Sequence, residues 1–253
     1  MPAIARGRVR GFTLTELAVV FAVVSLLLAA GMYTLSAQTE QRNFEETRQR
    51  LDAARELLLA FAVANGRLPC PATATSSGQE APVGGATACT SPYGGFLPGR
   101  TIGFQVTNQS GYAVDAWGRP LRYAVAALLT GCAGTSTTPH FTQSINLRTN
   151  GITCQPNDLV VCQSATGITS TTCGSATPVT NQSTLVALVF STGKNGATGG
   201  TGADEAANLN GDRVFVWHTP TPSTATNGEF DDQMTWITVG ELYGKLIAAG
   251  LLP

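Results

Sequence analysis

Residues 17–35 form an apolar run without a charged side chain, directly after a short basic segment. At about 1.5 Å per residue, a helix over these positions comes close to the ~30 Å thickness of a bilayer core. Arg6, Arg8 and Arg10 precede the run, and basic residues before a span favour a cytoplasmic N-terminus. The sequence therefore predicts that about residues 12–36 form the membrane-spanning half of a helix. The chain that follows this half is expected to be exported.

An ordinary secretory signal is the first alternative, because it also begins with basic residues followed by an apolar core. Here the apolar run is longer than such a core, and no clear Ala-x-Ala cleavage site follows it. Glu16 is the unusual residue, an acid at the edge of the run. An intramembrane acid without a partner is costly, which makes Glu16 a candidate functional residue. The alternative is that Glu16 lies at the headgroup level and is only solvated.

The helix is expected to continue beyond the membrane. Residues 38–64 contain neither Pro nor Gly and many good helix formers. Spacings of seven, three, four and three residues place five apolar side chains on one stripe: Phe44, Leu51, Ala54, Leu58 and Phe61. Asn65-Gly66 then ends the helix. We expect one helix over about residues 12–64, the alternative being two helices broken near Gly31.

Residues 65–253 are expected to form one exported, β-rich globular domain. Residues 184–190 are a continuous apolar run typical of a buried strand. The other predicted elements are strands over 158–162, 213–218 and 234–239, a long Gly/Asn loop over 193–211 and a short amphipathic helix over 240–250. The predicted fold class is α+β, with a long N-terminal helix whose stripe is covered by an antiparallel sheet.

Six cysteines follow the apolar run: Cys70, Cys89, Cys132, Cys154, Cys162 and Cys173. An even number of cysteines on the exported side indicates disulfides. Zinc is the alternative, but no pair has Cys-x-x-Cys spacing and the chain has only two histidines. Sequence alone does not fix the connectivity. Because loop closure favours near neighbours, we expect the pairs 70–89, 132–154 and 162–173.

Composition argues against nucleic-acid binding and catalysis. Residues 1–11 hold three of the 15 basic side chains and none of the 16 acidic ones, so the rest of the chain is net negative and lacks a basic footprint. No nucleophile-elbow, zinc-protease or phosphate-loop motif is present. His140 and His218 have no obvious catalytic partners, and we predict no enzyme. The tryptophans are interpreted as core residues rather than ligand platforms: Trp117, Trp217 and Trp236.

Gly11-Phe12-Thr-Leu-Thr-Glu16 before a long apolar run resembles the prepilin signal of type IV pilins and type II secretion pseudopilins. The resemblance implies that residues 1–11 are a leader, which a prepilin peptidase removes by cutting between Gly11 and Phe12 before it methylates Phe12. Glu16 becomes the fifth mature residue, where the family carries its glutamate, and would meet a neighbouring subunit's N-terminal amine. The implied fold is pilin-like, with the sheet packed on the second half of the helix.

Islands further along the chain are similar to segments of major pseudopilins. They are Asn65-Gly-Arg-Leu-Pro69, Asp115-Ala-Trp-Gly-Arg-Pro-Leu-Arg-Tyr123, Ser191-Thr-Gly-Lys-Asn-Gly-Ala-Thr-Gly-Gly200 and Asp232-x-x-x-Trp236, with Asn195 where the relatives have Asp. Tyr33 stands where many relatives have proline, and the cysteine-rich segment 131–183 is not part of the small pseudopilin core. Whether the subunit is major or minor therefore stays open.

The final loop of those relatives binds calcium. Asp204, Asn210, Asp212 and Asp232 are the candidate calcium ligands here, and Glu205, Asn208 and Asp231 offer further hard oxygen donors of the kind Ca²⁺ takes. The loop lacks the bidentate glutamate of an EF-hand. The alternative is a solvated turn whose Asn and Asp residues serve turn geometry.

Two functions follow as expectations. The first is a structural subunit of a type IV pilus or type II secretion filament, held in the bacterial inner membrane by a single pass with its C-terminal domain in the periplasm. Its expected partners are prepilin peptidase, other pilin or pseudopilin subunits, the membrane and an inner-membrane assembly platform. The alternative is a membrane-tethered or tip-located minor pilin that binds or adheres through its cysteine-rich segment. The machine served, whether for secretion, adhesion, motility or DNA uptake, is left open.

Overall fold

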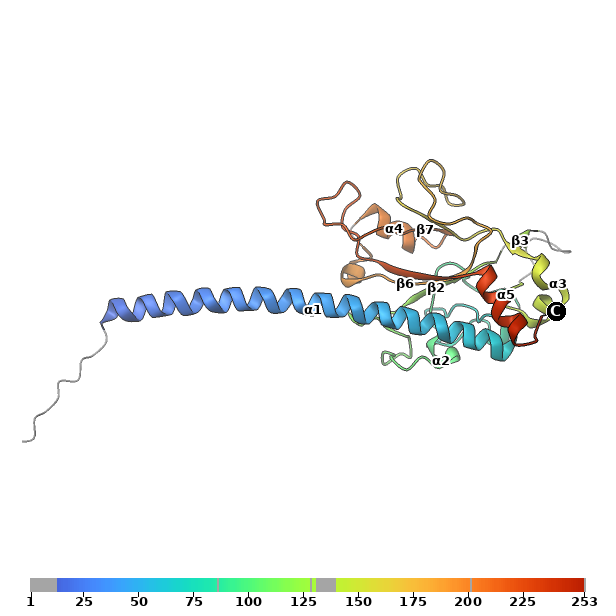
Figure 1. The fold of residues 1–253 in the computed structure, drawn as a ribbon, viewed down its shortest axis with the longest axis horizontal. Helices are drawn as coiled ribbons and strands as arrows, with labels where there is room; N and C mark the ends of the chain where they lie inside the picture. Colours follow the sequence, from blue (N-terminus) through green and yellow to red (C-terminus); the bar gives the residue numbers. More distant parts are fainter. Residues whose placement is uncertain (1–12, 86, 128, 131–139, 201, 253) are drawn as a thin grey trace, which may run out of the picture. The chain divides into compact units, whose positions relative to one another are not determined.

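The structure, a computed structural model, describes residues 13–252 apart from 86, 128, 131–139 and 201, and it describes their side chains except at 30–36 and 129–130. One helix, α1, runs over Leu14–Asn65 and is continuous through Gly31 (Figure 1). This agrees with a single helix rather than two broken near Gly31. The chain divides into two compact units, residues 1–44 and 45–253.

In the first unit, the apolar side chains of α1 over residues 14–29 are exposed. Each large one leaves 45–85% of its surface uncovered: Leu14, Leu17, Val19, Val20, Phe21, Val23, Val24, Leu26, Leu27 and Leu28. Within the part of the chain that the structure describes, no helix has both the length and the apolar character needed to cross a membrane.

The second unit is built on a four-stranded antiparallel sheet in the order β1-β2-β6-β8. Its strands are β1 (Gly95–Phe96), β2 (Arg122–Val125), β6 (Leu185–Ser191) and β8 (Gln233–Thr238). All seven residues of β6 are buried, as its continuous apolar sequence predicts. A helix combined with this sheet confirms the α+β fold class.

The part of α1 in this second unit supplies one side of the core. Leu51, Ala54 and Leu58 are at most 2% exposed and share the main hydrophobic core with the sheet, while Phe61 is partly buried against it. Arg55 Nε donates to the Trp236 carbonyl at 3.0 Å, which joins α1 to β8. The predicted stripe is therefore the buried face of this part of α1.

A second layer of short elements lies on the side of the sheet opposite α1, so the sheet stands between α1 and this layer (Figure 1). Phe215 packs against Phe190 of β6 with ring centroids 5.8 Å apart. The layer includes the parallel pair β5 (Val160–Cys162) and β7 (Val214–Val216), and α4 (Ala203–Leu209). The remaining elements are η1 (Val83–Gly85), α2 (Gly99–Ile102), β3 (Leu129–Thr130), α3 (Ser144–Asn150), η2 (Gly151–Thr153), β4 (Gln155–Pro156), η3 (Lys194–Thr198) and α5 (Val239–Ala248).

Two sequence expectations need correction. The segment 193–211 is not simply a loop, because it contains η3 and α4. Alanines and leucine favour this short helix, and the acids Asp204 and Glu205 in its first turn suit the helix dipole. The core interpretation is wrong for Trp217, which is 36% exposed, whereas Trp236 is partly buried against the main core.

The described cysteines are oxidised. Cys70–Cys89 and Cys162–Cys173 are disulfides, and these are two of the three pairs that loop closure favours. Cys154 is disulfide-bonded as well. Cys132 lies outside the described residues, so the pairing 132–154 stays a prediction.

Candidate functional site

The start of α1 is the first candidate site. Gly11 and Phe12, the predicted cleavage and methylation residues, lie outside the described residues. Thr13 and Glu16 form a reciprocal capping box. The Thr13 backbone N–H and Oγ1–H each donate to Glu16 Oε2 at 2.9 Å, and the Glu16 N–H donates to Thr13 Oγ1 at 3.2 Å.

Sequence reasoning missed this cap, although Thr-x-x-Glu is the capping-box pattern. Glu16 therefore serves its own helix, and an exposed position at the helix start leaves it open to a second partner as well. Among the described residues, Glu16 Oε1 accepts no hydrogen bond. One carboxylate oxygen caps the helix and the other stays available.

The turn after Asp115 links two of the sequence islands. Asp115 is 1% exposed, and its Oδ1 accepts the backbone N–H groups of Trp117 at 2.9 Å and Arg119 at 2.8 Å. Its Oδ2 accepts the hydroxyl of Ser191, the last residue of β6. Burial raises the pKa of the Asp115 carboxyl. This motif is therefore a structural clamp between a turn and the sheet.

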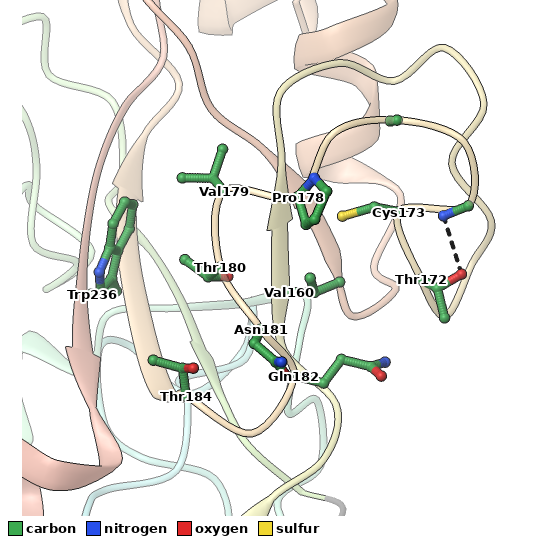
Figure 2. A pocket seen from close by; sticks show the side chains of 12 residues that line it. Val160, Thr172, Cys173, Pro178, Val179, Thr180, Asn181, Gln182, Thr184 and Trp236 are labelled. Carbon is green, nitrogen blue, oxygen red and sulfur yellow. Dashed lines mark hydrogen bonds between the residues drawn. The ribbon is translucent and has the colours of Figure 1, made fainter.

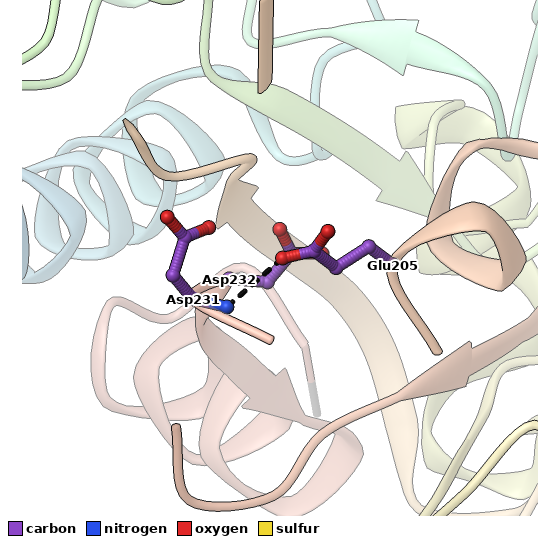
Figure 3. Close-up of side chains that lie close together, drawn as sticks. All are labelled: Glu205, Asp231 and Asp232. Atoms are coloured by element: carbon purple, nitrogen blue, oxygen red, sulfur yellow. Dashed lines mark hydrogen bonds between the residues drawn. The ribbon is translucent and has the colours of Figure 1, made fainter. Parts of the chain in front are cut away.

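The second candidate site is a buried cluster of three carboxylates, which the motif starting at Ser191 borders. The cluster consists of Glu205, Asp231 and Asp232 (Figure 3). They are 1%, 5% and 3% exposed, and one oxygen from each lies within 4.8 Å of the others. Glu205 comes from the first turn of α4, whereas the two aspartates directly precede β8. The contact thus joins residues that are 26 positions apart in sequence.

Backbone and amide groups hold the three carboxylates. Asp231 donates its N–H to Glu205 Oε1 at 3.0 Å, and Asp231 Oδ2 accepts the Lys194 N–H at 2.9 Å. Asn195 Nδ2 donates to both Glu205 oxygens at 2.9 Å. Asp232 Oδ2 accepts Asn208 Nδ2 at 2.7 Å. The side chains are therefore positioned by η3, α4 and the start of β8 together.

Two glycines of the Ser191–Gly200 motif make room for these groups. Gly193 has φ +63°, and a Cβ there would lie 2.0 Å from Asp231 Oδ1. Gly200 has φ +79°, and its Cβ would lie 2.6 Å from the Glu205 Cβ. Any other residue type at either position would collide with the cluster. The motif therefore builds the cradle in which the carboxylates lie.

Close packing of three acids in a buried place is electrostatically unfavourable without a proton or a cation. Burial, and then the charge of Glu205, raise the pKa of Asp231 to about 7. Burial likewise raises the pKa of Asp232 well above its usual value. Asp231 Oδ1 and Asn195 Oδ1 are buried without a hydrogen-bond partner. The cluster therefore offers unpaired hard oxygens of the type that Ca²⁺ binds.

The predicted calcium ligands are only partly brought together. Asp232 belongs to the cluster, joined by Glu205 and Asp231 from the wider set of oxygen donors. Asn210 and Asp212 instead form an exposed turn, with Asn210 Nδ2 2.9 Å from Asp212 Oδ2. Their alternate spacing serves turn geometry.

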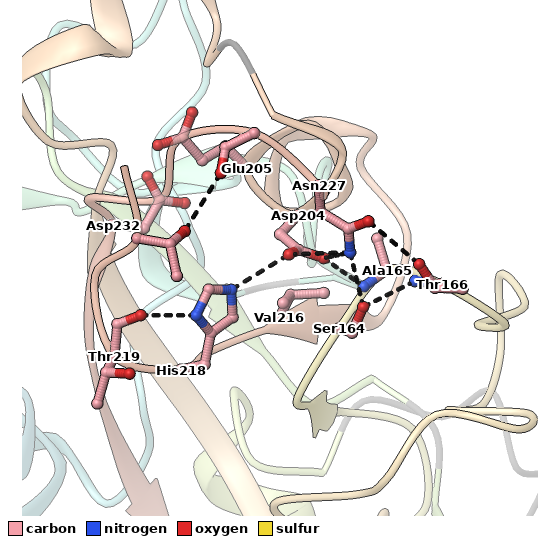
Figure 4. Close-up of polar contacts among 12 residues, drawn as sticks. Ser164, Ala165, Thr166, Asp204, Glu205, Val216, His218, Thr219, Asn227 and Asp232 are labelled. Atoms are coloured by element: carbon pink, nitrogen blue, oxygen red, sulfur yellow. Dashed lines mark hydrogen bonds and ion pairs between the residues drawn. The ribbon is translucent and has the colours of Figure 1, made fainter. Parts of the chain in front are cut away.

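Asp204 lies in a separate polar network (Figure 4). Its Oδ2 is 3.2 Å from His218 Nε2, and Asn227 Nδ2 donates to its carboxylate at 3.0 and 3.1 Å. Asp204 Oδ1 accepts the Ala165 N–H at 2.5 Å. The network ties the cysteine-rich segment to α4 and to the loop after β7, which is a structural role for Asp204 and His218.

The comparisons with known proteins concern the start of the chain. Residues 6–32 match the family model described as the prokaryotic N-terminal methylation motif. The matched range includes Gly11, Phe12 and Glu16. No curated protein and no solved structure matches the chain.

Proposed function

Since residues 6–32 carry a prepilin-type signal of the type IV pilin and pseudopilin kind, we propose that this chain is a structural subunit of a type IV pilus or type II secretion filament. The methylation motif is the observation that carries the proposal, because it implies processing by prepilin peptidase and assembly with other subunits. A long α1 joined to an α+β domain supports it.

The exposed apolar side chains of α1 support a single-pass anchor in the inner membrane. Leaving ten large apolar side chains in water is costly, at roughly 1.5–3 kcal/mol for each one that could be buried. A bilayer before assembly and neighbouring helices after it are the surroundings we propose. Basic residues before the run favour a cytoplasmic N-terminus. The disulfides suit an oxidising compartment such as the periplasm.

Calcium is proposed as the ion for the carboxylate cluster. Glu205, Asp231 and Asp232 would supply charged oxygens and Asn195 Oδ1 a neutral one. A divalent cation there would offset the repulsion among the carboxylates. Its role would be to stabilise the segment that connects β6, α4 and β8, not to take part in chemistry.

Processing is tested with the full chain and its peptidase. Wild-type chain should lose residues 1–11 and gain a methyl group on Phe12, both visible in the intact mass. Gly11→Leu should stay full length, because leucine does not fit a site shaped for a residue without a side chain. Gly7→Leu, which changes a leader glycine away from the cleavage position, is the matched control and should be cleaved. Wild-type chain that keeps Met1 in the presence of active peptidase would overturn the proposal.

A tip-located subunit with a binding role is the second candidate function. The observation that favours it is a groove at the cysteine-rich segment, described below. Labelled antibody on sheared filaments distinguishes the two functions. A filament-body subunit is labelled along the whole length, and a tip subunit only at one end.

A further inference from the structure

A groove of about 710 Å³ opens between the cysteine-rich segment and the sheet (Figure 2). This volume is within the ~300–1,000 Å³ typical of small-molecule sites. Trp236 of β8 forms one wall, and the segment 178–184 runs through the site. The residues that line the groove include none of α1 and none of the carboxylate cluster. Neither the assembly proposal nor the calcium proposal therefore uses this groove.

The lining of the groove is uncharged. None of the described residues that line it carries an ionisable side chain, since Cys173 is in a disulfide. Apolar contacts come from Val160, Pro178 and Val179 beside Trp236. The polar groups are hydroxyls and amides, which both donate and accept hydrogen bonds. Such a lining suits a neutral ligand rather than an anion or a cation.

Several of these polar atoms have no partner within the described chain: Asn181 Nδ2, Gln182 Oε1 and Thr184 Oγ1. The Trp236 indole N–H is likewise without a partner among the described residues. The groove therefore presents amide and hydroxyl groups along the segment 178–184, with Trp236 as an aromatic wall. A ligand with several hydroxyl groups can bond to groups of this kind.

The site is rigidly held. Val161 of β5 accepts the N–H groups of Val179 at 2.7 Å and Thr180 at 3.2 Å, and its own N–H donates to Thr180 Oγ1 at 3.0 Å. The bridge Cys162–Cys173 closes the other side. Trp236 packs edge-to-face with Trp217 at 5.8 Å, which fixes its orientation. A preorganised site loses little freedom when it binds.

We propose that this groove binds a neutral carbohydrate, with a sugar ring stacked on Trp236 and its hydroxyls bonded to Asn181, Gln182 and Thr184. The apolar C–H face of a sugar suits an aromatic wall, and its hydroxyls suit amides that lack partners. A peptide added as a strand at β8 is disfavoured, because the Trp236 carbonyl already accepts Arg55 Nε.

The test uses the processed full chain in a detergent without a sugar headgroup, such as an amine oxide. Maltotriose, cellotriose and chitotriose are titrated while tryptophan emission and calorimetric heat are followed. Sialyllactose serves as the charged arm, and an uncharged apolar hexapeptide as the peptide arm. At least one neutral trisaccharide should bind, more tightly than sialyllactose and with a change in emission.

Trp236→Ala should weaken that binding about tenfold or more, which corresponds to about 1.4 kcal/mol. Trp117→Phe, a substitution outside the groove, is the matched control and should bind like wild type. Asn181 is exposed, and its side chain accepts hydrogen bonds only from the neighbouring Ser183, so Asn181→Ala should keep the fold. Combined with Thr184→Val, it should weaken binding even if Trp236→Ala proves unstable. The proposal is overturned if no neutral trisaccharide binds at millimolar concentration, if only the peptide binds, or if binding survives the Asn181→Ala/Thr184→Val double variant unchanged.

Discussion

Arg67 and Glu80 form a buried two-pronged ion pair, with Nη1 2.8 Å from Oε2 and Nη2 2.7 Å from Oε1. The pair stands where the chain leaves α1, and Glu80 also accepts the N–H groups of Cys70 at 3.1 Å and Gly84 at 3.0 Å. The carboxylate thus organises the first loop around the bridge Cys70–Cys89. One side chain therefore holds the connection between the helix and the loop that leads to β1.

Replacing Glu80 by glutamine should be strongly destabilising. The change leaves the Arg67 charge buried without its counter-ion, a loss of about 3–5 kcal/mol in the free energy of unfolding. Urea denaturation of the processed chain measures it. Glu56→Gln, which removes only an exposed ion pair with Arg55, should cost under about 1 kcal/mol. Equal losses in the two variants would contradict the structural role of the buried pair.

The same pair predicts a pH dependence. Burial by itself would raise the pKa of Glu80, but Arg67 and the backbone donors together outweigh it and hold this pKa below its ordinary value of 4.5. A lowered pKa gives stability that is present above pH 4.5 and is lost as the pH falls through the folded-state pKa. The difference between wild type and Glu80→Gln should therefore shrink as the pH is lowered below this point. A difference that grows in acid would contradict the sign.

His140 should give a second, separable acid sensitivity. It is 1% exposed, and its Nε2 is 3.1 Å from the Tyr243 hydroxyl, which itself donates to the Cys154 carbonyl. The histidine Nε2–H is thus the donor. Burial lowers the pKa of His140 from 6.5 to about 4. Between these values the unfolded chain binds a proton that the folded chain does not, so stability falls as the pH falls.

The slope from His140 should approach about 1.4 kcal/mol per pH unit within that window. His140→Phe removes the titrating group, so the stability of wild type relative to this variant should fall with that slope as the pH drops from 6.5 to 4. The raised carboxylates Asp231 and Asp232 titrate in both proteins and cancel in the difference. Tyr243→Phe keeps the buried histidine and should retain the slope. If both variants titrate like wild type, His140 is not the source of the acid sensitivity.

Some of this architecture could be predicted from sequence because it depends on local periodicity. The stripe of Leu51, Ala54 and Leu58 predicted α1, and the apolar run of β6 predicted a buried strand. The capping box of Thr13 and Glu16 was missed, but it too could have been predicted, since both partners lie within one turn. Helices with a strong 3.6-residue apolar repeat and strands with a continuous apolar run can be predicted without knowledge of tertiary contacts.

The carboxylate cluster could be predicted only in part, because it depends on contacts between residues far apart in the sequence, which local patterns do not reveal. Glu205 reaches Asp231 only because the first turn of α4 lies beside the two residues that precede β8, and α4 itself stands among glycines that suggested a loop. Their oxygen side chains made Asn210 and Asp212 candidate ligands, yet these two residues form an exposed turn. The exposure of Trp217 likewise depends on which side of β7 is covered.

Calcium should raise the melting temperature of the metal-free chain. At a concentration about 100 times the dissociation constant, binding adds about 2.7 kcal/mol, or roughly 5–10 °C for a domain of this size. Asp231→Asn and Asp232→Asn should each abolish the rise, because each removes a charged oxygen from the cluster. Asp212→Asn, in the exposed turn, is the control and should keep it. A melting temperature that millimolar calcium leaves unmoved in wild type would rule out the cation.

The cysteines should be fully oxidised in the exported chain. A thiol count under denaturing, non-reducing conditions should find none free. The Cys162→Ser/Cys173→Ser double variant should lose about 2–4 kcal/mol, because the bridge restrains the unfolded segment. It should also weaken sugar binding, since this bridge closes the groove, whereas the Cys70→Ser/Cys89→Ser variant should lose stability but keep any binding. Finding free thiols in the exported wild type would argue against the periplasmic assignment.

The last prediction separates the two roles open to Glu16, capping its own helix and meeting the methylated amine of Phe12 in a neighbouring subunit. Glu16→Ala removes both and should be cleaved and remain in the membrane but enter filaments poorly. Glu16→Gln keeps an acceptor for the Thr13 N–H, as capping boxes allow, and removes only the charge.

Thr13→Val does the reverse, because it deletes the hydroxyl of the cap and leaves the carboxylate. If the charge pairs with an amine in a place of low dielectric, Glu16→Gln should assemble as poorly as Glu16→Ala, while Thr13→Val should assemble nearly like wild type. Glu16→Asp keeps the charge with a shorter reach and should be intermediate. Each variant is co-expressed with the assembly machinery, and subunit in sheared filaments is quantified against subunit in membranes. If Thr13→Val and Glu16→Ala fail equally while Glu16→Gln assembles, the carboxylate acts only as a cap and the axial step of the filament must be set elsewhere.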